Sequence, residues 1–234
     1  MLYLLPNLLD ESQSTTLLLP KMVDEIVATL DGLIGESERA SRRYLKRFVT
    51  KKPLQQMRVN ILNEHTEERE LKTLLEPLQQ GEIWGLISDA GLPCIADPGS
   101  KLVALARQMN IPIQAIMGPS SIFLALMLSG MSGQHFSFHG YLPKEEKERK
   151  QQIHRLEEDA KKYQRTHIFI ETPYRTQALL QEFIAVLGEK TRLCLAVDLT
   201  MQSQIVVTQP VAAWRKKELP DVNKRPALFL IASY

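Results

Sequence analysis

Residues 88–99 combine acidic and small residues in the way that a loop built to hold a small ligand needs them. Asp89 and Asp97 supply carboxylates, which accept hydrogen bonds from amino and hydroxyl groups. Gly91 and Gly99 allow positive φ and a close approach of the backbone to a ligand. This loop is the strongest functional candidate in the chain, with Asp89 and the backbone around Ala90 and Gly91 as its expected contacts.

A second loop of small residues, Gly118 to Ser121, precedes the apolar run that starts at Ile122. Ser120, Ser121 and the first N–H groups of a helix beginning there could bind a carboxylate, because helix N-termini favour anions. The alternative is that both loops are ordinary turns. Asp97-Pro98-Gly99 suits a type II turn, and Ser121 suits a helix cap.

The elements around the first loop place it at the end of a strand. Residues 83–87 form an apolar run short enough for a buried strand, and residues 102–109 have helical spacing, with Ser100 as the expected cap. The predicted order of elements is therefore strand, loop, helix. A loop at the carboxyl end of a central strand is where open α/β sheets usually bind ligands.

The rest of the first half repeats strand and helix, which predicts a parallel α/β sheet. The strand at 111–116 should lie near an edge because Pro112 lacks an N–H group, and residues 7–20 are expected to be a loop. The other expected strands are 2–5, 33–34 and 59–62, and the expected helices are 22–30, 37–49 and 66–80.

The second half predicts a mixed sheet with at least one antiparallel pair, formed by 193–199 and 204–208. Thr172 and Pro173 are a good N-cap and first residue for a helix over 173–187. The other expected elements are strands 136–142, 167–171 and 227–232, helices 122–128 and 144–165, and a short helix near Trp214. The expected domains are 1–117 and 118–234, both α/β.

The helix expected at 37–49 carries Arg39, Arg42, Arg43 and Lys46 on one face. One interpretation is a solvated face whose arginine stems cover apolar surface, and the other is a stripe that binds the phosphates of RNA. The formal net charge of the whole chain is only +2, which by itself does not indicate nucleic acid.

The composition predicts a cytoplasmic globular protein. No apolar run is long enough for a membrane span, and no signal peptide is apparent. The two cysteines, Cys94 and Cys194, have neither metal-binding nor redox spacing, so we expect free thiols and no metal site.

Several short motifs occur in one order along the chain. The segment Ser88-Asp89-Ala90-Gly91-x-Pro93, followed by Ala96-Asp97-Pro98-Gly99, resembles the signature of the ribosomal RNA small subunit methyltransferase I family. That family belongs to the tetrapyrrole-methylase superfamily of class III methyltransferases. The resemblance covers nearly the whole chain, with further matching motifs at 2–6, 118–121, 140–143, 171–175, 186–189 and 199–200.

The resemblance implies a two-domain fold with a cleft for S-adenosylmethionine between the domains, ribose 2′-O-methylation of ribosomal RNA, and a homodimer. Tyr141, Leu142 and Leu199 would wall the adenine. The positions that match the family's cofactor pocket are Pro6, Asp89, Ala90, Gly91, Ile95, Ser120, Ser121, Ile122, Tyr141, Leu142, Leu199 and Pro226.

Methyl transfer from a sulfonium is an in-line displacement, so alignment and exclusion of water can supply much of the rate. An alcohol acceptor would still benefit from a general base, for which Glu36, His65 and Asp97 are the candidates. Each of these residues could instead be a cap or part of a surface ion pair. The sequence assigns the role to none of them.

Three departures from the family pattern leave other functions open. The first loop lacks the expected Gly-Asn and leads to Asp10 and Glu11, whose charges should repel a phosphate near the pocket. Residues 37–38 replace the middle of a Glu-Asp-Thr-Arg segment, and residues 224–226 replace a Lys-Gly-Glu segment. The alternatives are methylation of a tetrapyrrole-like or other small molecule, and a degenerate cofactor-binding protein.

Overall fold

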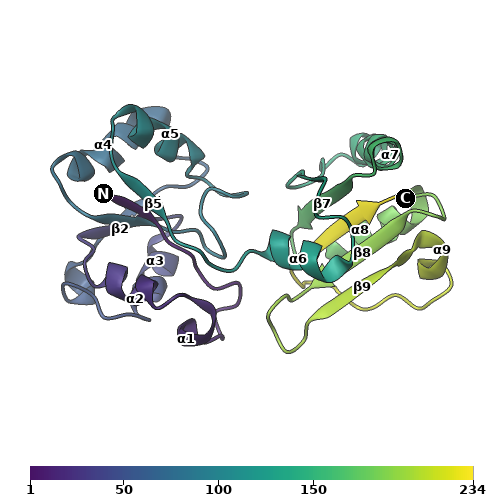
Figure 1. Ribbon diagram of the computed structural model, residues 1–234, viewed down its shortest axis with the longest axis horizontal. Coiled ribbons are helices and arrows are strands. Elements are labelled where there is room, and N and C mark those ends of the chain that lie inside the picture. Colours follow the sequence, from purple (N-terminus) through teal and green to yellow (C-terminus); the bar gives the residue numbers. More distant parts are fainter. Residues whose placement is uncertain (234) are drawn as a thin grey trace. The chain divides into compact units, whose positions relative to one another are not determined.

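The computed structural model describes residues 1–233 and contains two compact units (Figure 1). The chain passes from the first unit to the second between Ser120 and Ser121. The sequence places this boundary near residue 117. Each unit has its own five-stranded sheet and its own cores.

The first unit alternates strands and helices, as expected. Its strands are β1 (Leu2–Leu4), β2 (Gly32–Gly35), β3 (Arg58–Ile61), β4 (Trp84–Leu86) and β5 (Ile113–Ala115). Its helices are α1 (Thr15–Leu18), α2 (Met22–Val27), α3 (Glu38–Leu45), the 3-10 helix η1 (Leu54–Gln56), α4 (Glu68–Gln79) and α5 (Ser100–Gln108).

All strand pairs in the first sheet are parallel, in the order β3-β2-β4-β1-β5. The strand before the candidate loop, β4, is therefore central, and β5 is an edge strand, as Pro112 predicted. Because all five strands run in one direction, the loops that follow them emerge at one edge of the sheet.

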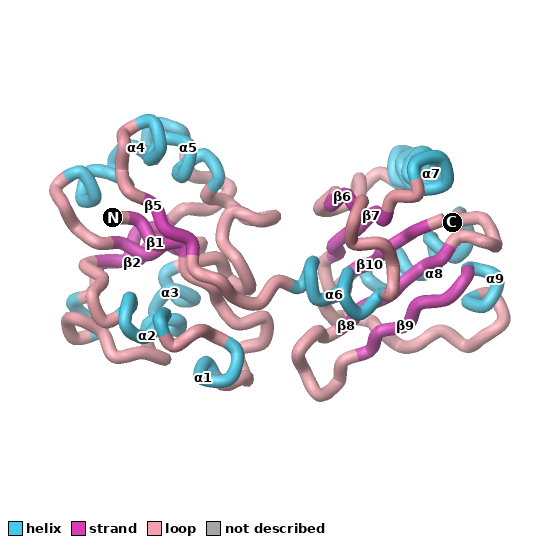
Figure 2. Tube along the Cα trace, in the orientation of Figure 1, coloured by secondary structure: helices cyan, strands magenta, loops and turns pink. Residues whose placement is uncertain are grey.

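Helices cover both faces of this sheet (Figure 2). On β2, Leu33 packs with α2 and α3 on one face, and its neighbour Ile34 packs with α4 and α5 on the other, because successive side chains of a strand alternate. The neighbours β1 and β4 lead to helices on opposite faces, α2 and α5. This is the arrangement that opens a ligand crevice at the carboxyl ends of an α/β sheet.

The second unit has a mixed sheet in the order β6-β7-β10-β8-β9. The pair β6 and β7 is parallel and the other pairs are antiparallel, including the expected pair β8 and β9. Its strands are β6 (Phe136–Phe138), β7 (Thr166–Glu171), β8 (Arg192–Val197), β9 (Ile205–Pro210) and β10 (Ala227–Ala232). Its helices are α6 (Ser121–Ser129), α7 (Glu146–Tyr163), α8 (Thr176–Val186) and α9 (Val211–Trp214).

The central strand β10 shows how the second core is divided. Phe229 and Ile231 pack in the cluster that contains α7, α8 and α9, whereas Leu228 and Leu230 pack in the cluster that contains α6. The strand is buried on both faces, which explains its uninterrupted apolar sequence.

Three local expectations were wrong. Gly99, with φ +136°, is the N-cap of α5, and Ser100 is the first helical residue. The helix α8 begins at Thr176 instead of 173, because the Arg175 N–H donates to the Thr172 carbonyl (2.9 Å) in a turn that precedes the helix, and Arg175 is its N-cap. The expected loop at 7–20 contains the short helix α1.

Within residues 1–233, no helix is both long and apolar enough to cross a membrane.

Candidate functional site

Three loops of the first unit meet at the carboxyl edge of its sheet, where β1, β4 and β5 end. The Asn7 N–H donates to the Gly91 carbonyl (2.7 Å), which joins the first two loops. A Cβ atom on Gly118 would lie 2.0 Å from Cβ of Pro6, so the third loop passes too close to Pro6 for any residue except glycine. The structure thus brings together Pro6, Gly91 and the segment that ends at Ser120.

The side chain of Asn7 holds the first loop to the second, a role that the sequence analysis missed. It is 5% exposed, and its Nδ2 donates to the carbonyls of Ser88 (3.0 Å) and Asp89 (2.9 Å). Its Oδ1 accepts from Arg47 Nη1 (2.8 Å). A polar residue between the buried Pro6 and Leu8 was the available signal.

Three carboxyl groups gather at this edge. Glu36, which follows β2, accepts a hydrogen bond from the Asp89 N–H (2.9 Å), and burial raises the pKa of its carboxyl. Burial, followed by the charges of Glu36 and Asp89, raises the pKa of Asp97 to about 7. Such a site favours a ligand that carries a positive charge or hydrogen-bond donors and disfavours a bare phosphate.

The second loop also holds strained backbone. Cys94 (φ 70°) and Ala96 (φ 62°) both lie in the left-handed region although neither is glycine. Ile95 between them is 38% exposed, so the loop presents an apolar side chain at its surface. Burial and the neighbouring Asp97 raise the pKa of the Cys94 thiol to about 11, which keeps it protonated and a poor nucleophile at neutral pH.

The third candidate base, His65, lies in the loop that follows β3, at the same edge of the sheet. Its side chain is 83% exposed and beside Glu64. Glu36 and Asp97 are the two candidates whose carboxyl pKa values are raised in part by the charge of Asp89.

The expected cofactor residues of the second unit differ in how much of each side chain is exposed and can contact a ligand. Ile122 and Leu199 lie in the core on the α6 face of the sheet, and Leu142 lies in the core on the other face. With 2–7% exposure, these three side chains are largely packed inside the protein. Tyr141 is 54% exposed, and Pro226 is also exposed. Ser121 begins α6.

Arg225, which lies in a segment that departs from the family pattern, connects the loops next to Leu199 and Pro226. Its Nε donates to Asp198 Oδ2 (2.8 Å) and its Nη2 to the carbonyl of Ser203 (2.6 Å). Asp198 and Thr200 have positive φ, so this loop is also strained. The departure at 224–226 thus provides a structural ion pair between two segments that flank candidate residues.

The basic helix α3 is capped at Ser37, whose Oγ accepts from the Ala40 N–H (3.2 Å). It ends at Leu45, earlier than expected. Arg42 Nη1 donates to the carbonyls of Leu54 (2.6 Å) and Met57 (2.7 Å), so this guanidinium anchors η1.

Arg43 on the same helix forms an ion pair with Glu11. Arg43 therefore offsets the charge of Glu11, one of the two acids of the first loop that are expected to repel a phosphate. Arg39 and Lys46 are exposed. Two of the four expected phosphate-binding cations thus have internal partners, and two face solvent.

Comparisons with known proteins agree with this architecture. The family model of tetrapyrrole (corrin/porphyrin) methylases matches residues 18–213. The ribosomal RNA small subunit methyltransferase I of Haemophilus influenzae is 33% identical over 200 residues, which cover 86% of this chain and 68% of the relative. The protein of the same name from Escherichia coli O157:H7 is 32% identical and covers 86% and 67%. The chain thus spans about two thirds of the length of these relatives.

Solved structures show the same fold at low sequence identity. The methyltransferase CobJ aligns with a TM-score of 0.63 and 13% identity over 99% of this chain and 92% of its own. The cobalt precorrin-4 methyltransferase CbiF aligns with a TM-score of 0.60 and 16% identity, covering 99% and 94%.

The family match, the identity to the relatives and the shared architecture lead to one assignment. The fold is the tetrapyrrole-methylase fold of class III methyltransferases. By sequence and by fold, this chain is a methyltransferase that belongs to the tetrapyrrole (corrin/porphyrin) methylase family, together with the ribosomal RNA small subunit methyltransferases I.

Proposed function

We propose that this protein transfers a methyl group from S-adenosylmethionine to ribosomal RNA of the small subunit, at a ribose 2′ oxygen. The similarity to ribosomal RNA small subunit methyltransferases I supports the substrate. The observation that carries the proposal for the site is the meeting of three loops at the carboxyl edge of the first sheet. Hydrogen bonds of Asn7 join the first two loops, and the third passes close to Pro6 at Gly118.

The residues present suit the methyl donor. S-adenosylmethionine has a cationic sulfonium and an amino group, and both are attracted by the carboxylates of Glu36 and Asp89. Ser120, Ser121 and the N-terminus of α6 would bind its carboxylate. The backbone of Ala90 and Gly91 would contact the amino-acid end or the ribose hydroxyls.

The adenine would be bound by the second unit together with residues of the first two loops. Tyr141 offers an exposed ring, whereas Leu142 and Leu199 would contribute mainly through their backbone. Ile122 would contribute the helix N–H next to Ser121. Pro6, Ile95 and Pro226 would complete the pocket.

Asp97 is the general base that we favour. A base with a pKa near the working pH combines an available proton acceptor with a useful driving force, and the pKa of Asp97 is about 7. Partial burial also reduces the access of water to this carboxyl. His65 is too exposed to offer such an environment.

The RNA would contact the basic helix α3, chiefly through Arg39 and Lys46, with Arg42 and Arg43 adding charge beside it. We also propose that the protein works in the cytoplasm and that it forms a homodimer. The two units would be the N-terminal and C-terminal domains of the enzyme.

A second candidate is methylation of a small, tetrapyrrole-like molecule. The carboxylates at the sheet edge and the internal pairing of Arg42 and Arg43 favour it, because both reduce the attraction for phosphates. A cofactor-binding protein without activity is the third possibility.

The test is transfer of radiolabelled methyl groups from S-adenosylmethionine to small-subunit RNA from a strain that lacks this gene. We expect one labelled nucleotide per RNA, with the label on the ribose. Asp89→Asn should reduce labelling strongly, whereas the matched control Asp221→Asn, on an exposed loop, should not. Cofactor binding by calorimetry without labelling of any RNA would reject the proposal, and labelling of a tetrapyrrole would favour the second candidate.

A further inference from the structure

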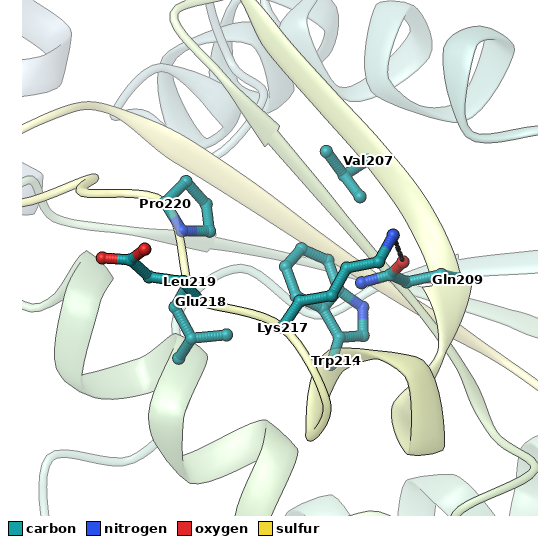
Figure 3. Close-up of a pocket in the computed structure, with 7 residues that line it drawn as sticks. All are labelled: Val207, Gln209, Trp214, Lys217, Glu218, Leu219 and Pro220. Carbon is teal, nitrogen blue, oxygen red and sulfur yellow. Dashed lines mark hydrogen bonds between the residues drawn. The ribbon is translucent and has the colours of Figure 1, made fainter.

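A cavity of about 420 Å³ lies in the second unit beside β9 and α9 (Figure 3). We call it the β9 cavity. Val207 and Gln209 line it from β9, Trp214 from α9, and Lys217, Glu218, Leu219 and Pro220 from the segment that follows α9.

The base of this cavity is rigid. Trp214 is 2% exposed and its Nε1 donates to the Leu193 carbonyl on β8 (3.0 Å), so the indole is fixed to the sheet. Val207 and Leu219 pack against the same core cluster. The cavity therefore has a fixed apolar base against which a flat ligand could pack.

Two polar side chains meet across the cavity. Lys217 Nζ donates to Gln209 Oε1 at 3.5 Å, a long and therefore weak contact that Figure 3 marks with a dashed line. A ligand could replace it at little cost. The Gln209 amide has both donors and an acceptor, which match the hydrogen-bonding edge of a nucleobase.

The charge around the cavity favours an anion. Arg215, Lys216 and Lys217 are consecutive and exposed, and Glu218 is the one acid among the lining residues. The Arg215 guanidinium already binds the Ile184 carbonyl (3.0–3.1 Å). The cations left for a phosphate are thus Lys216 and Lys217.

The β9 cavity is separate from the candidate cofactor residues of the second unit. In the register of β8 and β9, Ile205 pairs with Val197, next to the loop of Leu199, whereas Gln209 pairs with Leu193. Four residues along a strand correspond to about 14 Å. The methyl donor proposed above would therefore not occupy this cavity.

We propose that the β9 cavity binds one nucleotide of single-stranded RNA. The base lies between Val207 and Pro220 with its edge on Gln209, and the phosphate lies on Lys216 and Lys217. This inference rests on the proposed function, since it gives the substrate RNA a second contact away from the methyl-transfer site. It also supplies the apolar base contact and the phosphate contact that single-strand binding combines.

The test uses the fluorescence of Trp214. Of the two tryptophans in the chain, Trp84 is replaced in a Trp84→Phe background, and an unstructured oligoribonucleotide is titrated at several salt concentrations. We expect the oligonucleotide to change the emission. Lys217→Ala should weaken binding about tenfold and flatten the slope of log affinity against log salt by about 0.7.

Gln209→Ala should weaken binding without changing the salt slope, because it removes no charge. Leu219→Phe should also weaken binding, because the larger side chain occupies part of the cavity. Lys147→Ala, which removes an exposed cation from α7, is the control and should change neither quantity. Circular dichroism would establish that each variant is folded.

Several outcomes would overturn the proposal. One is an emission that the oligonucleotide leaves unchanged. Another is equal affinity in the Lys217, Gln209 and Lys147 variants. A third is an equal response to poly-glutamate, which would identify an acidic polypeptide as the occupant. If a protein with any of these results still labels ribosomal RNA, the proposed function stands and only the inference about the β9 cavity fails. If the oligonucleotide changes the emission but no RNA is labelled, only the proposed function fails.

Discussion

At the scale of single residues, the candidate site depends on a side chain whose partners are far away in the sequence. Asn7 joins the loop after β1 to the loop after β4 through two carbonyl acceptors, 81 and 82 positions along the chain. Its amide is the right group for this position, because it donates to carbonyls while accepting from Arg47.

Replacing Asn7 should therefore destabilise the first unit and loosen the site. Asn7→Ala leaves buried carbonyl groups and Arg47 without their partner, which we expect to cost about 2–3 kcal/mol of unfolding free energy. Urea denaturation measures this cost, and Asn223→Ala on an exposed loop is the control. An equal stability of the two variants would mean that water replaces the lost hydrogen bonds.

Asp97 should make stability depend on pH. Its carboxyl has a folded pKa of about 7 against a reference of 3.8, so the folded protein holds this proton in a range where the unfolded chain has lost it. The stabilisation that this bound proton gives the folded protein is complete below pH 3.8 and decreases as the pH rises to about 7.

The Asp97→Asn variant tests this dependence because it cannot titrate. Relative to the variant, the wild-type protein should lose about 1–2 kcal/mol of stability between pH 4 and pH 7, a range that allows for screening of this partly exposed group. Denaturation at a series of pH values measures the difference. Parallel curves for the two proteins would show that the pKa of Asp97 is not raised.

At the scale of elements, the helix α3 divides its cations between two tasks. Arg42 holds η1 through carbonyl groups, and Arg43 pairs with Glu11, whereas Arg39 and Lys46 face solvent. Some cations that form a stripe in the sequence therefore have structural roles, because neighbouring segments of the folded chain supply acceptors for them.

This division predicts different effects for neighbouring arginines. Arg42→Ala should reduce the unfolding free energy by about 1–3 kcal/mol, because two carbonyls lose a charged donor. Arg39→Ala should leave stability nearly unchanged, yet together with Lys46→Ala it should flatten the salt slope of RNA binding by about 1.4. Thermal denaturation would measure the effect on stability, and filter binding the effect on RNA. If the changes at Arg39 and Lys46 leave RNA binding and its salt slope unaltered, the RNA binds elsewhere.

At the scale of the whole molecule, the chain consists of two units with different sheets, one parallel and one mixed. Each unit has its own cores, formed on both faces of its sheet.

We predict a homodimer, for which light scattering gives a direct measurement. The expected mass at micromolar concentration is about twice the 26.7 kDa of one chain. Exposed apolar side chains on α6, such as Phe123 and Met127, supply surface that a partner could cover. A monomer mass at all accessible concentrations would contradict the prediction.

The sequence by itself determined the order and type of most elements, because their signals are local. The apolar runs gave the strands, Pro112 gave the edge position of β5, and Ser37 gave the start of α3. The motifs at 88–99 and 118–121 identified the family and pointed to loops at the carboxyl edge. The cofactor residues chosen from them remain predictions.

Only the tertiary structure decided which polar groups hold the site together and what their charges are. The role of Asn7, the pairing of Glu11 with Arg43 and the anchoring by Arg42 join residues 12 to 82 positions apart. The raised pKa of Asp97 depends on burial and on Glu36 from another strand. Such contacts leave no periodic pattern in the sequence, because they are set by which loops of the folded sheet emerge side by side.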